Sequence, residues 1–141
     1  MQVVRLVACG RTNSEIGAEL NVSPTTVKQD LGRLGARFGA GDRAGIVGAA
    51  IRSGHLEVPV TGGVPAGFDE ALFDVLVRIA RGMSNGEIAA DLCLRLEQVK
   101  RRVRRLLAVL GVSSREEAVS AGVACGALRL VPARRRVAVA A

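Results

Sequence analysis

The stretch RLEQVKRRVRRLLAVLG, from Arg95 to Gly111, decides the fold of this 141-residue chain. At helical spacing, an apolar residue recurs at i, i+4, i+7 and i+11 on one face. These residues are Val99, Val103, Leu106 and Leu110. The opposite face carries Lys100, Arg101, Arg104 and Arg105, with Arg102 beside them. The pattern predicts a helix that buries one side and exposes a densely cationic one.

A shorter helix is expected immediately before this basic one. The segment from Ser84 to Cys93 opens with Ser-Asn-Gly-Glu, a capping box that starts a helix. Two helices joined by a tight connection, the second basic on its outer face, form a helix-turn-helix pattern. In that pattern the second helix enters the major groove of DNA.

Composition favours a polyanionic partner and gives no sign of catalysis. The net charge is +7 and the isoelectric point about 10.9, as in many nucleic-acid-binding proteins. The sequence shows no nucleophile–base pair, no phosphate-binding glycine loop and no metal-ligand spacing, so we expect neither an enzyme nor a cofactor. Cys9, Cys93 and Cys125 are expected as small buried residues. No apolar run is long enough to span a membrane, and no signal peptide is recognisable, so a cytoplasmic protein is expected.

The chain repeats itself with a period of 72 residues. Val3–Leu56 aligns with Val75–Leu128 without a gap, and 19 of the 54 pairs are identical. A period of this length is that of a small domain rather than of a solenoid unit. Between the copies, Glu57–Gly67 is rich in Pro and Gly and is expected to be a flexible linker. Its 11 residues could reach roughly 37 Å if fully extended.

Each copy is predicted to contain four helices. In the second copy these begin after Asp69, after Ser84, with the basic helix, and after Ser114. In the first copy, Ser23 and Asp42 are the expected caps of the third and fourth helices. Its third helix has an apolar stripe of Val27, Leu31, Leu34 and Phe38. Met1 aligns with Phe73, so this copy lacks counterparts of Phe68–Leu72, the first turn of its first helix. Either the true start lies upstream or the first domain is trimmed.

The predicted fold is therefore all-α, with two tandem four-helix domains joined by a Pro/Gly linker. The expected boundaries are 1–56 for the first domain, 57–67 for the linker, 68–130 for the second domain and 131–141 for a basic flexible tail. Arg134–Arg136 lie in this tail, which would either be disordered or act as an arm that contacts phosphates.

Both copies resemble the LuxR/GerE-type helix-turn-helix domain of bacterial transcription regulators. The first copy carries VVRLVACGRTNSEIGAELNVSPTTVKQDL and then LGARFGAGDRAGIV. The second carries VLVRIARGMSNGEIAADLCLRLEQVK and then LLAVLGVSSREEAV, a looser match. It lacks the Ser-x-x-Thr opening of the third helix, where Arg95 and Gln98 stand instead.

The resemblance implies which residues contact DNA. The lysine of the T-V-K string, the next residue and the one four after the lysine would face base edges. The expected base contacts are Lys28, Gln29 and Gly32 in the first copy, and Lys100, Arg101 and Arg104 in the second. The expected phosphate contacts are Ser23, Thr25, Thr26 and Arg33 in the first copy, and Arg102 and Arg105 in the second. Lys and Arg suit guanine O6 and N7, and Gln suits adenine.

The sequence thus predicts a DNA-binding transcription regulator. The alternative is a protein-interaction module of degenerate domains that pair with other regulators or with RNA polymerase. The resemblance implies a fourth helix that often mediates pairing. In this chain Ile46, Val47, Ala50 and Ile51 could form a dimer seam or merely cover the core. Pairing through this helix would join either two chains in a homodimer or the two copies of one chain. In the latter case a single chain would span two half-sites about 34 Å apart.

Overall fold

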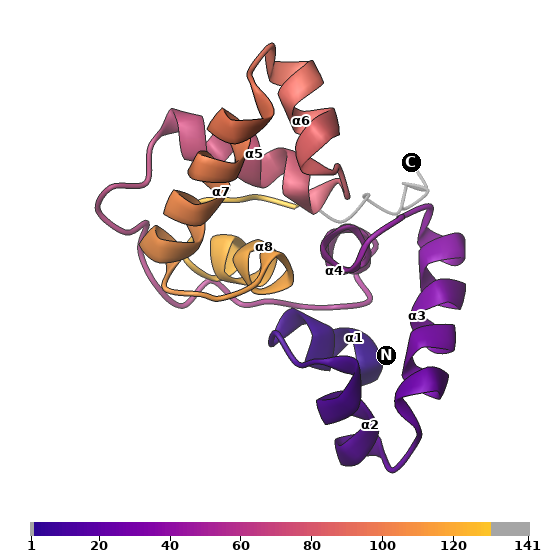
Figure 1. Cartoon of the computed structure of the whole chain (residues 1–141). Coiled ribbons are helices and arrows are strands. Elements are labelled where there is room, and N and C mark those ends of the chain that lie inside the picture. The colour runs from indigo at the N-terminus through magenta and orange to yellow at the C-terminus, as the bar shows by residue number, and fades with distance from the viewer. Residues whose placement is uncertain (1, 131–141) are drawn as a thin grey trace, which may run out of the picture.

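The computed structural model describes residues 2–130, and these contain helices but no strands. The expected all-helical fold is confirmed. The predicted contacts of Arg134–Arg136 lie outside the described residues. The helices are α1 (Gln2–Ala8), α2 (Asn13–Leu20), α3 (Pro24–Phe38), α4 (Arg43–Arg52), α5 (Glu70–Ala80), α6 (Asn85–Leu92), α7 (Leu96–Leu110) and α8 (Arg115–Ala124) (Figure 1).

The helices of the two halves correspond one to one. Helices α2 and α6 each have 8 residues, α3 and α7 each have 15, and α4 and α8 each have 10. Only the first pair differs, because α1 has 7 residues where α5 has 11.

Capping side chains set the helix boundaries. Thr12 and Ser84 begin α2 and α6, each in a capping box with the glutamate three residues later. The hydrogen bond from the Thr12 hydroxyl to Glu15 lowers the pKa of that carboxyl. Ser114 accepts from the backbone N–H of Glu117 at 3.2 Å, so α8 begins where the sequence predicts. The Glu117 carboxylate accepts from the Ser114 hydroxyl rather than from its backbone.

The predicted apolar stripes face a single hydrophobic core. Val99, Val103 and Leu106 of α7 are buried, and so are Val27 and Leu31 of α3. The outer members of each stripe, Leu34, Phe38 and Leu110, are half-buried against this core. The buried residues of both halves form one continuous cluster. Within residues 2–130, the buried side chains are all apolar.

Helix α4 lies at the centre of the molecule. It packs on α1 and α3 of its own half and on α5 and α8 of the other half. Seven of its residues are buried: Ala44, Gly45, Ile46, Val47, Gly48, Ala50 and Ile51. A helix that is apolar all round needs neighbours on every side. Figure 1 shows α3 and α7 on opposite flanks of the α4–α8 pair, running in opposite directions.

The segment between the halves, which is expected to be a flexible linker, is held against the protein at several points. The backbone N–H groups of Thr61 and Gly62 donate to the Ala124 carbonyl at 2.9 and 3.2 Å. Leu56 is buried and Val58 is half-buried. These contacts hold the segment against the end of α8, so the linker is part of the packed structure.

The expectation of buried cysteines is wrong. Cys9 and Cys93 are exposed, and Cys125 is half-buried. All three follow or end a helix, and Cys93 caps α6 in the left-handed conformation with φ of 54°. Helix ends lie at the surface here, which exposes these side chains. The described residues contain no cluster of His, Cys, Asp and Glu that could hold a metal. None of the described helices is long and apolar enough to cross a membrane.

Candidate nucleic-acid interface

The cationic face of α7 is exposed. Lys100, Arg101, Arg104 and Arg105 are all exposed, and Arg102 is half-buried. The buried stripe of α7 holds this face outward, so the arrangement matches the prediction from helical spacing. Five positive side chains on fewer than two turns of helix create a strongly positive local potential, which attracts polyanions.

The charges on α7 differ in how far other residues neutralise them. Arg105 donates to Asp69 Oδ2 at 2.7 Å and to the Gly67 carbonyl at 3.2 Å. Lys100 Nζ lies 3.3 Å from Glu97 Oε1. Arg101, Arg102 and Arg104 form no hydrogen bond or ion pair with the residues that the structure describes. Of these three, Arg101 and Arg104 are exposed and Arg102 is half-buried, so the guanidinium groups of Arg101 and Arg104 are the most available for a phosphate or a base.

Arg105 also supports the start of α5. Asp69 accepts from the backbone N–H of Leu72 at 3.0 Å and caps that helix. This hydrogen bond, followed by the one from Arg105, lowers the pKa of the Asp69 carboxyl. Because Asp69 lies 36 residues before Arg105, helical spacing gives no sign of the pair. Arg105 therefore has a structural contact that the predicted phosphate role does not include.

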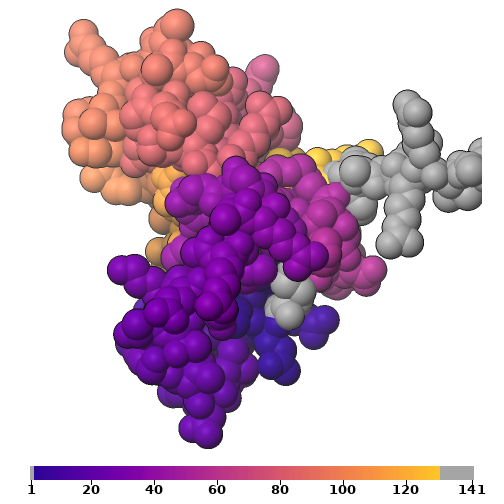
Figure 2. All heavy atoms as spheres, turned by 90° about the vertical axis from the view of Figure 1, so that its right-hand side faces the viewer, coloured from indigo at the N-terminus to yellow at the C-terminus, as the bar shows by residue number. Residues whose placement is uncertain are grey.

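The corresponding face of α3 is also exposed but carries less charge. Lys28, Gln29, Gly32 and Arg33 are exposed. A Cβ added to Gly32 would meet no atom within 4 Å, so the helix backbone is open to solvent there. Arg33 lies 3.7 Å from Asp30. Figure 2 views the molecule from the α3 side, where the second half does not cover this purple surface.

The hydroxyl groups at the start of α3 already serve its cap. Ser23 Oγ accepts from the backbone N–H of Thr26 at 3.1 Å and lies 2.9 Å from Thr26 Oγ1. Ser23 and Thr25 are exposed, and Thr26 is half-buried. At the N-terminus of a helix, exposed hydroxyl and N–H groups suit an anion such as phosphate.

Two arginines that are not among the predicted site residues join the fourth helix of each half to the segment that begins its second helix. Arg115 donates to Asn85 Oδ1 at 2.6 Å and to the Met83 carbonyl at 2.7 Å. Arg43 donates to Asn13 and to the Arg11 carbonyl in the same way. In each half these hydrogen bonds join the start of the fourth helix to the start of the second. The sequence does contain a sign of this contact, because the arginine and the asparagine are identical in the two copies of the repeat.

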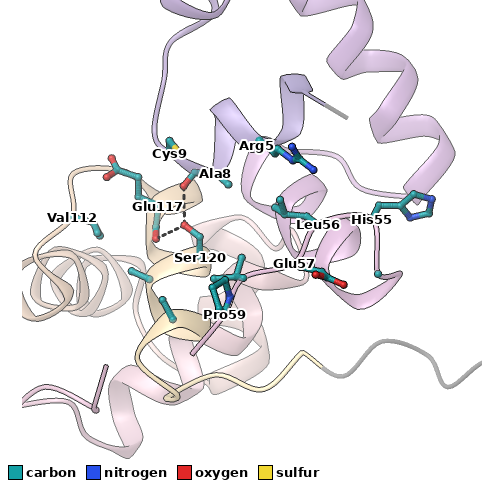
Figure 3. Close-up of a pocket in the computed structure, with 14 residues that line it drawn as sticks. Arg5, Ala8, Cys9, His55, Leu56, Glu57, Pro59, Val112, Glu117 and Ser120 are labelled. Atoms are coloured by element: carbon teal, nitrogen blue, oxygen red, sulfur yellow. Dashed lines mark hydrogen bonds between the residues drawn. The ribbon is translucent and has the colours of Figure 1, made fainter. Parts of the chain in front are cut away.

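A groove lies between the two halves. It has a volume of about 800 Å³ and lies between α1, residues 54–59 and α8 (Figure 3). At its inner edge Ser120 Oγ donates to the Ala8 carbonyl at 2.7 Å. The groove contains none of the predicted DNA contacts, and no pattern in the sequence indicates it.

Comparison with known proteins assigns the first half. Residues 1–50 match the family model described as bacterial regulatory proteins, luxR family. Residues 1–50 are therefore one LuxR-type helix-turn-helix domain. A 56-residue stretch is 41% identical to the probable transcriptional regulatory protein NarL of Mycobacterium tuberculosis, in strains CDC 1551 and H37Rv. This stretch is 40% of the chain and 26% of the relative, so the match covers about a quarter of the relative's length. No solved structure matches the chain.

Proposed function

We propose that this chain is a sequence-specific DNA-binding transcription regulator with two tandem helix-turn-helix domains, at residues 1–56 and 68–130. The observation that carries the proposal is the exposed basic face of α7, which has an exposed but less charged counterpart on α3. The LuxR-type domain at residues 1–50 and the regulatory name of the 41% identical relative support it. The net charge of +7 favours the same partner.

In the second domain, α7 would enter the major groove. Lys100, Arg101 and Arg104 would donate to base edges, where an arginine fork fits guanine O6 and N7. Arg102 and Arg105 would neutralise phosphates and fix the position of the helix. The full exposure of Arg101 and Arg104, against the half-buried Arg102, supports their assignment to base contacts.

In the first domain, α3 would recognise bases with fewer side chains. Lys28 and Gln29 would contact base edges, and Gln29 suits adenine N6 and N7. Gly32 has no side chain but leaves open space for close approach of the backbone. Ser23, Thr25, Thr26 and Arg33 would contact phosphates around the start of the helix and its outer face.

One chain would occupy two half-sites. The packing of α4 on α8 supports pairing of the two domains within a chain. The same packing leaves these helices less surface for a homodimer. Linking two weak modules raises the effective concentration of the second to roughly millimolar, which strengthens binding without any new contact.

The test is a gel shift of the full chain with genomic fragments, followed by footprinting and by light scattering of the complex on a short duplex. We expect retardation of specific fragments, a footprint of about two helical turns and one chain per duplex. No fragment bound above background would contradict the proposal. Two chains on the same site would contradict the intrachain pairing alone.

A charge-matched pair of variants tests the assignment to α7. R101Q/R104Q removes two positive charges from α7, whereas R81Q/R129Q removes two from exposed positions on other segments. We expect the first variant to lose specific retardation and the second to keep it. Equal losses would show that net charge alone causes the binding.

A further inference from the structure

The two halves contact each other through the same positions. Ser120 Oγ donates to the Ala8 carbonyl at 2.7 Å (Figure 3). The 72-residue shift that aligns the halves converts this pair into Gly48 and Ala80. Gly48 does lie against Ala80, so closely that an added Cβ would come within 2.0 Å of the Ala80 carbonyl oxygen. The contact from α8 to α1 thus has its counterpart from α4 to α5.

A second pair of contacts obeys the same exchange. A Cβ added to Gly45 would lie 2.7 Å from Gly82 Cα. The shifted counterpart is Gly10 with Glu117, and a Cβ on Gly10 would lie 2.1 Å from Glu117 Oε1. Each half therefore presents one patch, made of the end of its first helix and one face of its fourth, to the equivalent patch of the other.

Contacts that exchange in this way define a two-fold relation. In an isologous interface, residue i of one unit contacts j of the other, and j contacts i. A head-to-tail arrangement would join two different patches instead. The opposite directions of α3 and α7 in Figure 1 agree with a two-fold axis between the halves. The chain is therefore arranged as a dimer whose two subunits are joined covalently.

The relation between the halves is held by close packing and not by the linker alone. Gly48 and Ala80 bring α4 and α5 into backbone contact, which leaves no room for a shift. Arg52 Nη1 donates to the Ala80 carbonyl at 3.2 Å, and burial lowers the pKa of this arginine. Arg43 Nε lies 3.5 Å from Glu116 Oε1 across the same interface.

We propose that one chain recognises an inverted repeat whose two half-sites differ in sequence and are separated by a fixed spacing. This inference rests on the proposed function. Two-fold symmetry in a DNA-binding protein is matched by two-fold symmetry in its site, so the half-sites face opposite ways. The half-sites differ because α7 presents Arg101 and Arg104 where α3 presents Gln29 and Gly32. The spacing is fixed because the packed interface sets the separation of α3 from α7.

The experiment is selection of random duplexes by the full chain, followed by sequencing. The expected product is an inverted arrangement of two unlike half-sites at one spacing. The selected site is then lengthened between the half-sites by about half a turn or about one full turn, which is 5 or 10 base pairs. Both insertions should weaken binding about 100-fold, because only one domain can then bind.

Each other outcome overturns a defined part of the argument. Direct repeats, a single half-site or identical half-sites would overturn the inference and leave the proposed function standing. The same holds if the full-turn insertion retains affinity, because a flexible tether between the halves would tolerate it. If no duplex is enriched over the starting pool, the proposed function fails and the inference fails with it.

Discussion

Helices α3 and α7 share their length, their C-terminal glycine and their first two buried positions, but they carry different exposed side chains. Both have 15 residues, and both end at a glycine in the left-handed conformation, Gly39 with φ of 65° and Gly111 with φ of 68°. Both also bury a valine just before an exposed lysine. Beyond these shared positions, α7 carries four arginines where α3 carries Gln29, Asp30, Gly32 and Arg33. The comparison shows that the core residues fix where the helix lies and leave its outer face free to differ.

The two helices also begin differently. Ser23 caps α3 through its side chain, and Pro24 occupies the first helical position. At the start of α7, Gln98 Oε1 accepts from the backbone N–H of Arg95 at 2.9 Å. Helix α7 therefore begins at the residue equivalent to the start of α3, although it has no capping hydroxyl. A helix can thus begin at the same position in both copies even where one copy lacks the capping motif.

The largest expected change in DNA affinity comes from disturbing the interface that sets the position of α3 relative to α7. Gly48→Leu would place a side chain where a Cβ alone meets the Ala80 carbonyl oxygen at 2.0 Å. We expect binding to the paired site to weaken about 100-fold, while binding to a single half-site is unchanged. Fluorescence anisotropy with both duplexes measures this, and circular dichroism monitors folding.

The matched control is Gly86→Leu, because a Cβ on this helical glycine meets only Ser84 Oγ at 3.9 Å. The control should bind the paired site as the unaltered chain does. If Gly48→Leu lowers helicity, the smaller Gly48→Ala replaces it, with the same direction of effect. Unchanged affinity of a folded Gly48 variant for the paired site would show that the interface does not couple the helices.

The second largest expected effect is the loss of DNA affinity when either of the equivalent lysines, Lys28 or Lys100, is replaced. Lys100→Ala and Lys28→Ala should each cost about 1–3 kcal/mol on the specific site and relax preference at one position of the corresponding half-site. Binding to a set of single-base variants of the site measures both changes. If either variant loses affinity by the same factor on specific and random DNA, that lysine contacts phosphate only.

The third effect concerns phosphate contacts. Each neutralised phosphate adds roughly 0.9 to the slope of log affinity against log salt concentration. Changing Arg102 and Arg105 together to alanine should therefore flatten this slope more than Arg33→Ala does. Titrations at several salt concentrations measure it. Equal slopes for the two variants would mean that both helices engage the backbone alike.

The smallest expected effect is on the free energy of unfolding. It concerns the hydrogen bond between Arg105 of α7 and Asp69, which has no counterpart on α3. Asp69 has its pKa below the ordinary value of 3.8, so its contribution to stability is present above that pH. This contribution is lost as pH falls through the folded-state pKa. Asp69→Asn, which retains a capping side chain, should therefore be less stable than the unaltered chain at pH 7. The difference should shrink towards pH 2.

Urea unfolding at both pH values measures this difference. A stability difference for Asp69→Asn that stays constant with pH would mean that the Asp69 charge makes no contribution.

Local features of this fold could be predicted from sequence, and long-range ones could not. The caps Thr12 and Ser84 act within one helical turn, so their spacing predicts them. The outward face of α7 follows from its buried stripe in the same way. The pairs Arg105–Asp69 and Arg115–Asn85 join residues 36 and 30 positions apart, which no periodicity records.

The packing of α4 was the largest feature that sequence reasoning left open. A helix that is apolar all round has no polar face to show which side meets its own domain and which meets another. Its pattern fits a homodimer, an intrachain pair or a central core helix equally well. The glycines at Gly45 and Gly48 are consistent with close approach of another backbone, but they do not identify that backbone.

The pairing of α4 with α8 inside one chain has a consequence for how a regulator of this kind responds to its own abundance. A regulator that must dimerise first forms its active species in proportion to the square of its concentration when the dimer is scarce. Here the partner is supplied by the same translation product, so occupancy of a site would rise with the first power of concentration. Doubling gene dosage would then give a proportionate change in occupancy at low saturation, without a threshold.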